Sequence, residues 1–350
     1  MLRLLNRLCF LARCLNCLTQ LLRAFKSFDM IYPMSKNLKY ILSESTHQYS
    51  LGPFNHCSTL LSLNNTLLTA FYTCQTECSS DQRVVLANDQ NHIELEPSTG
   101  NPVLFQDATG TGYLLYSKFI NHPAIRNPAM KWMFCDLYLR QIIDETQLTL
   151  SEPVKIADSE QHLLGRCAPI VVDGKTILPL YDEYNAQCVF YTGNGFEYDE
   201  THRFGRSVIQ PAIWVEDGHI NTLARNFRSD ELYAHHFNAY NGFDIVTNVP
   251  NNNSSIACLN YIDSVLYLYN NTTDVYRKNL TLGIRSNKLF RELQRIDDYG
   301  AYPSIIRHNN GFAFSYTTIY KTIKVKWFEN NYLFANTGFK GSRAKTDNIF

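Results

Sequence analysis

The sequence predicts an all-β protein, namely a six-bladed β-propeller with a short N-terminal helix. The main observation is a hairpin pattern that occurs six times, with units beginning at residues 57, 101, 167, 209, 256 and 302. A strand-built repeat of roughly 40–50 residues is typical of a propeller blade, and a closed ring of blades leaves few exposed strand edges. The composition agrees, because 22 tyrosines and 21 phenylalanines favour strands. The alternative is a long β-sandwich whose hairpins have this spacing by coincidence.

The clearest unit spans residues 209–225, where two short segments rich in β-branched and aromatic residues flank an Asp-Gly turn. Asp217 and Gly218 tolerate the positive φ that a tight hairpin turn requires. The other five units have the same form, with short polar turns between two strands. The expected strand pairs are 57–63 with 66–72, 101–106 with 113–118, 167–172 with 175–181, 209–215 with 219–225, 256–262 with 265–269, and 302–307 with 312–316.

The longest interval between units, residues 120–162, is expected to complete one blade. Residues 131–138 alternate like an outer strand, and residues 141–152 are expected to finish the same sheet. We therefore expect one propeller over residues 35–340, followed by a polar tail over residues 341–350.

Residues 1–34 differ in kind from the rest of the chain. Helix-forming residues dominate as far as Lys26, and the segment carries five basic residues against a single acid, Asp29. Its Arg-free stretch, residues 14–22, is too short to span a membrane, and no clear secretory signal is present. Residues 1–26 therefore predict a basic amphipathic helix that contacts a membrane surface. The alternatives are a packing helix, or upstream sequence ahead of a start at Met30 or Met34.

Charge and cysteine content narrow the class of protein. The formal net charge is zero, so the composition gives no sign of a nucleic-acid partner. Three of the ten cysteines lie in the N-terminal segment, and most of the other seven lie in strand-like contexts, which is more typical of a reducing compartment than of a disulfide framework. Cys74 and Cys78 form a lone C-x-x-x-C, a weak signal for a disulfide or a zinc site. We predict no cofactor, and we expect a cytoplasmic or peripheral membrane protein; no signal indicates an oligomeric state.

The inner strands of a propeller surround one axis, so residues at equivalent places in different units should meet in one polar funnel. Arginine side chains grip a carboxylate in a planar, bidentate way that lysine cannot copy. Reading the units this way predicts a site for an acidic sugar or glycan. The residues collected at the axis are Gln75, Glu77, Asp182, Glu183, Gln210, Arg225, Arg277 and Tyr302.

Five segments resemble a known family. They are residues 165–183 (GRCAPIVVDGKTILPLYDE), 209–211 (IQP), 223–225 (LAR), 276–277 (YR) and 300–305 (GAYPSI). Over about residues 50–330 the chain resembles the sialidase (neuraminidase) superfamily, and in particular its BNR-repeat, sialidase-like proteins. The resemblance implies a six-bladed propeller and a glycoside hydrolase in which a tyrosine, activated by a carboxylate, attacks the anomeric carbon. It also implies three arginines that hold the substrate carboxylate and an aspartate that acts as general acid.

Carried onto this sequence, the resemblance implies that Tyr302 is the nucleophile and that Arg225 and Arg277 are the second and third carboxylate-binding arginines. Two positions depart from the family pattern. His56 and its neighbours stand where the first arginine is expected, which leaves His56 a role in substrate binding. Gln210 stands where the activating glutamate is expected; it cannot take a proton, but it can hydrogen-bond a sugar hydroxyl.

Other carboxylates are placed to substitute for the missing ones. By position, Glu183 or Glu77 is a candidate base, and Glu77 or Asp81 is a candidate general acid. A phenol with a pKa near 10 needs such a base to attack at neutral pH.

Each of these residues also has a structural interpretation. Tyr302 is equally well explained as a packed aromatic at a strand end, Arg225 and Arg277 as partners of carboxylates such as Asp274, and Glu183 as a loop cap. Two hypotheses therefore stay open. One is a sialidase-like hydrolase, favoured by the retained tyrosine and arginines. The other is a propeller that binds glycan or protein without catalysis, favoured by the lost arginine and glutamate.

Overall fold

The structure is a computed structural model that describes residues 45–227, 231–238, 243–251, 253–274, 276–319 and 321–329. The chain divides into Met1–Ile41 and Leu42–Phe350, and all described residues belong to the second unit. The expected N-terminal helix, its membrane contact and the polar tail lie outside the described residues and stay predictions. Within those residues, no helix combines the length and the apolar character needed to cross a membrane.

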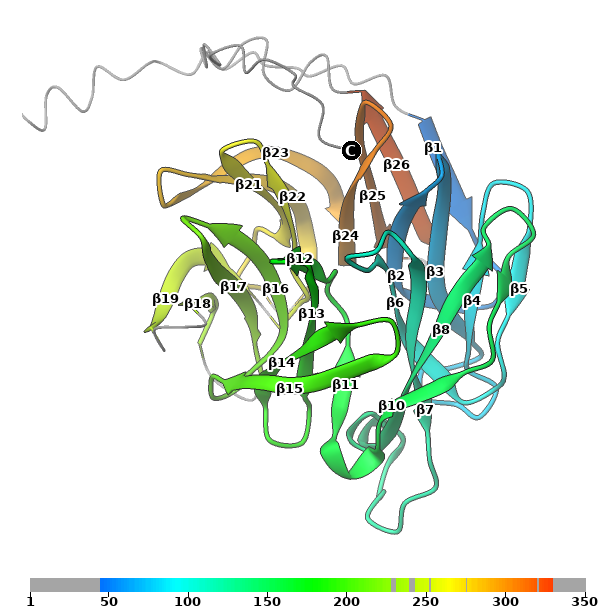
Figure 1. The fold of residues 1–350 in the computed structure, drawn as a ribbon. Helices are drawn as coiled ribbons and strands as arrows, with labels where there is room; N and C mark the ends of the chain where they lie inside the picture. The colour runs from blue at the N-terminus through cyan, green and yellow to red at the C-terminus, as the bar shows by residue number, and fades with distance from the viewer. Residues whose placement is uncertain are drawn as a thin grey trace, which may run out of the picture. The chain divides into compact units, whose positions relative to one another are not determined.

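Six antiparallel sheets follow one another along the chain and form a six-bladed β-propeller (Figure 1). Blade 1 contains β2 (Phe54–Leu63), β3 (Thr66–Cys74), β4 (Arg83–Ala87) and β5 (His92–Glu94). Blade 2 contains β6 (Thr99–Gln106), β7 (Gly112–Phe119), β8 (Cys135–Asp144), β9 (Thr149–Leu150) and β10 (Val154–Ala157). Blade 3 contains β11 (Leu163–Gly165), β12 (Ile170–Val172), β13 (Lys175–Asp182), β14 (Gln187–Asn194) and β15 (Glu197–Phe204).

The second half of the chain repeats the pattern. Blade 4 contains β16 (Val208–Glu216), β17 (His219–Asn226), β18 (Tyr233–Asn238) and β19 (Phe243–Pro250). Blade 5 contains β20 (Ala257–Tyr261), β21 (Ser264–Asn270), β22 (Lys278–Ser286) and β23 (Leu289–Tyr299). Blade 6 contains β24 (Ala301–His308), β25 (Gly311–Thr317), β26 (Ile323–Glu329) and, from the other end of the described chain, β1 (Ser45–Tyr49).

The ring closes through contacts between successive blades and through strand β1. The inner strand β2 contacts both β6 and β24, so the first blade lies between the second and the sixth. Strand β1 pairs with β26 over five residue pairs, from Ser45 opposite Trp327 to Tyr49 opposite Ile323. Blade 6 is therefore built from both ends of the described chain, and β1 supplies its outermost strand, which ties the first described residues to the last blade.

The hydrophobic core fills the seams between blades. Leu61 and Leu104 belong to the cluster between blades 1 and 2, and comparable clusters fill the other five seams. Trp214, which is fully buried, packs with Tyr267 between blades 4 and 5. Burial of a large apolar side chain contributes roughly 1.5–3 kcal/mol. The apolar side chains that alternate along each strand are thus buried against the neighbouring blade, as a propeller requires.

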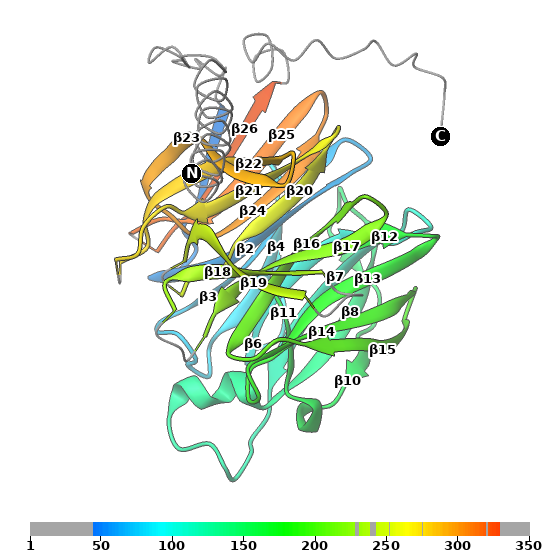
Figure 2. The ribbon, with the colours of Figure 1, turned by 90° about the vertical axis from the view of Figure 1, so that its left-hand side faces the viewer.

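The six expected hairpins are confirmed, and two details of the expected elements were wrong. Residues 131–138 are not one outer strand, because Pro128–Met133 forms the 3₁₀ helix η1, whose first turn is capped by the Asn127 side chain, and β8 begins only at Cys135. The inner strand expected at 167–172 is interrupted, because Pro169 has no N–H for the ladder; β11 ends at Gly165 and β12 begins at Ile170. Figure 2 shows the segment between β7 and β8, with η1, extending beyond the ends of the strands.

Candidate functional site

Three inner strands begin with the same backbone irregularity. Asn101 in β6, Gln210 in β16 and Tyr302 in β24 have φ values of 45°, 54° and 51°, and each directly precedes a proline. The pairing of each strand with its neighbour shifts register at this point, which marks a β-bulge. A bulge accommodates proline and re-aims a side chain, and bulges are frequent beside active sites. Here they direct the three side chains into one pocket.

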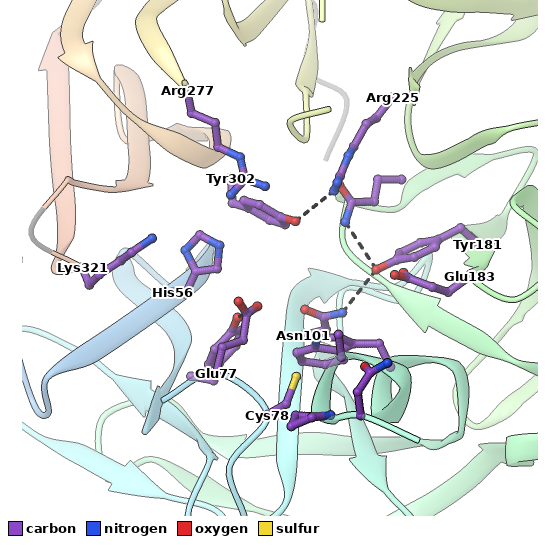
Figure 3. Close-up of a pocket in the computed structure, with 16 residues that line it drawn as sticks. His56, Glu77, Cys78, Asn101, Tyr181, Glu183, Arg225, Arg277, Tyr302 and Lys321 are labelled. Atoms are coloured by element: carbon purple, nitrogen blue, oxygen red, sulfur yellow. Dashed lines mark hydrogen bonds between the residues drawn. The ribbon is translucent and has the colours of Figure 1, made fainter. Parts of the chain in front are cut away.

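The pocket is a cavity of about 480 Å³ (Figure 3). Seven of the ten residues that the sequence proposes for the site line it: His56, Glu77, Glu183, Gln210, Arg225, Arg277 and Tyr302. The other lining residues are Tyr72, Cys78, Asn101, Asn127, Pro128, Ala129, Trp132, Tyr181 and Lys321. They come from blades 1 to 6, so the cavity exists only when the ring is closed.

The other three, namely Gln75 and Asp182 from the axis set and the candidate general acid Asp81, lie outside the cavity wall. The Asp81 carboxylate accepts a hydrogen bond of 3.0 Å from the backbone N–H of Gln75, which is exposed. Asp182 is buried and forms a 2.7 Å ion pair with Arg203. Among the acids that the sequence proposes, Glu77 and Glu183 are therefore the two that face the cavity.

Arg225 connects Gln210 and Tyr302 at the centre of the pocket. Its Nη1 donates hydrogen bonds of 2.9 Å both to Gln210 Oε1 and to Tyr302 Oη. Gln210 Nε2 in turn lies 3.4 Å from the hydroxyl of Tyr181, which also accepts a hydrogen bond of 3.2 Å from Asn101 Nδ2. Arginine, amides and phenols from four blades thus form one network across the axis (Figure 3).

Positive charge surrounds Tyr302. The guanidinium carbons of Arg277, Arg166 and Arg225 lie 4.8, 5.4 and 5.8 Å from the centre of its ring, which is within the range of a cation–π attraction. Lys321 lines the same cavity. In the part of the chain that the structure describes, none of these four cations has a carboxylate within ion-pair distance. The charge of the three that line the cavity is therefore available to a ligand.

Arg166 has a structural position that the other three cations do not share. It is 2% exposed and is not part of the cavity wall. Its Nη1 donates to the carbonyl of Ser58 at 3.0 Å, and its Nη2 donates to the carbonyl of Pro303 at 2.8 Å. A residue of blade 3 thus fastens the inner strands of blades 1 and 6 beside Tyr302.

His56 stands where the first carboxylate-binding arginine was expected, and it cannot supply that charge. The residue is 3% exposed, its Nδ1 lies 2.8 Å from Thr317 Oγ1, and its ring centre lies 4.5 Å from that of Tyr302. Burial, followed by the positive charge of Arg277, lowers the pKa of His56 well below its ordinary value. The imidazole is therefore neutral at physiological pH and can contribute only hydrogen bonds.

The two acids of the pocket have different surroundings. Glu77 Oε1 accepts a hydrogen bond of 2.8 Å from the hydroxyl of Tyr72. Burial and the negative charge of Glu77 raise the pKa of Tyr72 well above its ordinary value, so this hydroxyl stays protonated and donates. Figure 3 shows Glu183 on another side of the pocket, beside Tyr181. The pocket therefore offers two separate carboxylates for proton transfer.

Sequence reasoning missed several lining residues. Asn101 carried a usable signal, because it precedes a proline at the start of an inner strand as Gln210 and Tyr302 do. Trp132 and Lys321 carried none: the first belongs to a helical turn between two strands, and the second to the turn between β25 and β26. Their place at the axis follows from the closed ring alone.

The thiols near the pocket do not indicate a metal or a redox centre. Cys74 and Cys78 are free and buried, and the backbone N–H of Cys78 donates to Gln82 Oε1 at 2.9 Å. Burial raises the pKa of Cys78 to about 12, so the thiol stays protonated. Among the described residues, no group of three His, Cys, Asp or Glu side chains is arranged to hold a metal ion.

Solved structures with the same fold include the sialidase of Trypanosoma rangeli. A mutant of this enzyme that displays trans-sialidase activity aligns with a TM-score of 0.57 at 13% identity, over 82% of this chain and 59% of the other. The sialidase in complex with the inhibitor DANA aligns with a TM-score of 0.57 at 12% identity, over 82% and 60%. The complex with sialic acid aligns with a TM-score of 0.54 at 11% identity, over 83% and 60%. The chain spans about three fifths of the length of these sialidases, and at such identity the likeness shows the fold alone.

The sequence itself matches a family model. No curated protein sequence gives a significant match, but the model of the BNR repeat-like domain matches residues 69–314. The matched region runs from β3 in blade 1 to β25 in blade 6 and includes the pocket residues from Tyr72 to Tyr302. The chain therefore belongs to the BNR repeat-like family.

Proposed function

We propose that the protein is a sialidase-like glycoside hydrolase that acts on sialic acid or a related acidic sugar. One observation carries the proposal: Tyr302 lies among guanidinium groups in a cavity that also contains Glu77 and Glu183. A cavity of about 480 Å³ is of the size that takes a small-molecule ligand. The fold shared with sialidases supports the reaction class by analogy.

The charge of the pocket supports an acidic substrate. Arg225 and Arg277 line the cavity, and among the described residues their hydrogen-bond partners are neutral groups. For example, Arg225 donates to the side chain of Asn253, and Arg277 donates to its carbonyl. Guanidinium groups bind a carboxylate through two parallel hydrogen bonds, which fixes the orientation of the sugar as well as its affinity. In the proposed complex, the two arginines hold the substrate carboxylate beside Tyr302.

The proposed reaction has two steps. The first step requires Glu77 to be protonated in the substrate complex. Tyr302 Oη attacks the anomeric carbon while Glu183 takes its proton, and the glycosidic bond breaks as protonated Glu77 gives its proton to the leaving oxygen. Water then attacks the glycosyl–tyrosine bond, gives its proton to Glu77 and releases the sugar, and Tyr302 recovers its proton from Glu183. Asp81, which lies outside the cavity wall, has no part in this scheme.

A second candidate function is binding of an acidic glycan without hydrolysis. The observation that favours it is Gln210, which takes the place of a proton acceptor beside the phenol. Tyr302 Oη accepts its hydrogen bond from Arg225, and in the described part of the chain no carboxylate is hydrogen-bonded to it. This candidate keeps the same ligand and differs only in the chemistry.

The experiment that separates the two uses the full chain with fluorogenic glycosides of N-acetylneuraminic acid, glucuronic acid and galactose. Tyr302→Phe removes the proposed nucleophile, and Tyr316→Phe is the matched control, because it removes a hydroxyl of the same blade that bonds Asp297 outside the cavity. We expect release from an acidic glycoside, its loss in Tyr302→Phe and its retention in Tyr316→Phe.

Other results would change the conclusion. Release that Tyr302→Phe leaves unchanged would keep the hydrolase and remove the tyrosine mechanism. Binding of the free acidic sugar without release from any glycoside would establish the second candidate. The absence of both binding and release would refute the acidic-sugar site.

A further inference from the structure

The proposed carboxylate site has two arginines, Arg225 and Arg277, and His56 stands where the resemblance implies a third. The imidazole is neutral, and its Nδ1 is already engaged with Thr317 Oγ1 at 2.8 Å. Asn55, the residue before it, is fully buried and faces away to the turn between β25 and β26. The strand start of blade 1 therefore holds two residues without charge where an arginine would have entered the pocket.

That same turn carries a cation into the pocket. Lys321 lies in the turn, lines the cavity and has a φ of 56°. Its carbonyl accepts two hydrogen bonds from Asn55, one of 2.8 Å from the backbone N–H and one of 2.9 Å from Nδ2. Its own N–H donates to the carbonyl of Thr318 at 3.1 Å. The backbone of Lys321 is thus fixed directly by the neighbour of His56.

The side chain of Lys321 reaches toward the proposed reaction centre. Its Nζ lies 5.0 Å from the centre of the ring of Phe54, the first residue of β2 in blade 1. Figure 3 shows its amine directed toward Tyr302 and Arg277 from the side where His56 lies. No described carboxylate is within ion-pair distance of Lys321. Burial, followed by the positive charge of Arg277, lowers the pKa of this lysine, and the negative charge of Glu77 offsets part of that effect.

We propose that Lys321 supplies the third positive charge of the carboxylate site, in place of an arginine at His56, and that Asn55 holds it there. This inference rests on the proposed acidic-sugar function. The third contact is then a single ammonium group from blade 6 and not a bidentate guanidinium from blade 1. The carboxylate is bound by two planar forks and one point charge, and the neutral His56 lies beside them as a hydrogen-bonding group.

The test measures binding of N-acetylneuraminic acid and of its methyl ester to the full chain by isothermal titration calorimetry. Lys321→Met removes the charge and keeps the stem, and Lys321→Arg restores a charge. Lys324→Met is the matched control, because it removes a lysine from the same blade that pairs with Asp297 outside the cavity. We expect Lys321→Met to weaken binding of the acid roughly 10- to 100-fold and to leave binding of the ester unchanged. Lys321→Arg should recover most of the loss.

The outcomes separate this inference from the function on which it rests. If the wild type binds the acid and Lys321→Met binds it equally well, the inference is overturned and the acidic-sugar site stands. If Lys321→Met weakens the acid and the ester to the same degree, the lysine shapes the cavity without contacting the carboxylate, which also overturns the inference. If the wild type binds neither ligand, the proposed function fails and the inference with it.

Discussion

Gln210→Glu is expected to increase hydrolysis of an acidic glycoside, since it places a proton acceptor beside Tyr302. The amide oxygen of Gln210 and the hydroxyl oxygen of Tyr302 each accept a hydrogen bond of 2.9 Å from the same Arg225 nitrogen, so the two oxygens are close neighbours. Gln210 is 2% exposed, and a lone buried carboxylate would be costly. Arg225 at hydrogen-bond distance offsets that cost, so the variant should fold.

The size of the effect follows from proton transfer. In the proposed reaction the proton of Tyr302 passes to Glu183, but in the described part of the chain no carboxylate is hydrogen-bonded to the phenol, so a carboxylate at position 210 would be the better placed base. A positioned general base contributes about 10²- to 10⁴-fold, or about 3–5 kcal/mol of activation free energy. The new ion pair also draws Arg225 away from the substrate carboxylate, so KM should rise. Because Glu183 already supplies part of this effect in the proposed reaction, we expect kcat to increase by up to about 100-fold and kcat/KM to increase less.

The assay is steady-state hydrolysis of a fluorogenic sialoside, with urea denaturation to verify folding. Asn101→Asp is the matched control. Asn101 is a buried amide of the same cavity that donates to the hydroxyl of Tyr181, as Gln210 does, but it has no hydrogen bond to Arg225. Asn101→Asp therefore adds the same negative charge through the same amide-to-carboxylate replacement, but it does not place the carboxylate beside Tyr302.

The reasoning fails if folded Gln210→Glu protein still binds the sugar but gains no kcat. It fails equally if Asn101→Asp gains as much, because the effect would then reflect total negative charge and not a base beside Tyr302.

Two further predictions concern stability. Because the pKa of His56 is lowered on folding, the unfolded state takes up the proton as pH falls below about 6.5. The free energy of unfolding should therefore decrease by up to about 1.4 kcal/mol per pH unit for this group as the pH falls. Urea titrations between pH 7.5 and 5.5 should show that the free energy of unfolding changes less steeply with pH in His56→Gln than in the wild type. An equally steep change in both proteins would contradict the assignment. Gly193→Ala should lower the free energy of unfolding by about 3 kcal/mol or more, because the new Cβ would overlap the backbone carbonyl of Glu197. The control is Gly174→Ala: Gly174 has a φ of 72° and open space around it, so this substitution should lower the free energy of unfolding by about 1 kcal/mol in the same titration.

The fold was predictable because its signals are local. Each hairpin is specified by its own turn residues and by the alternation of its two strands, and six such units at a blade-like spacing leave little choice of architecture. The errors occurred where a proline or a helix cap interrupts a strand, because the alternation of apolar and polar residues gives no sign of such an interruption. Pro169 interrupts the inner strand of blade 3, and Pro128 with the Asn127 cap begins a helical turn where an outer strand was expected.

The candidate site was predictable where equivalent positions of the units could be compared. Tyr302 and Gln210 begin inner strands, so their meeting follows from ring symmetry. Between Glu77 and Asp81 the sequence had no means to choose, because both lie in one loop and only the folded loop decides which carboxylate turns inward. Lys321 was beyond reach for a related reason, since hydrogen bonds from Asn55, more than 250 residues away, place it in the pocket.

The pairing of β1 with β26 has a consequence for how the protein is made. During synthesis, blades 1 to 5 can form one after another as their hairpins emerge, because most of their contacts are local in sequence. Blade 6 must wait until Ile323–Glu329 is available to pair with Ser45–Tyr49, the most distant strand pair in the described chain. Tyr302 and Lys321 belong to the same last-made segment. Completion of the ring and completion of the pocket are therefore expected to be one late event, and a nascent chain that ends before β26 has neither.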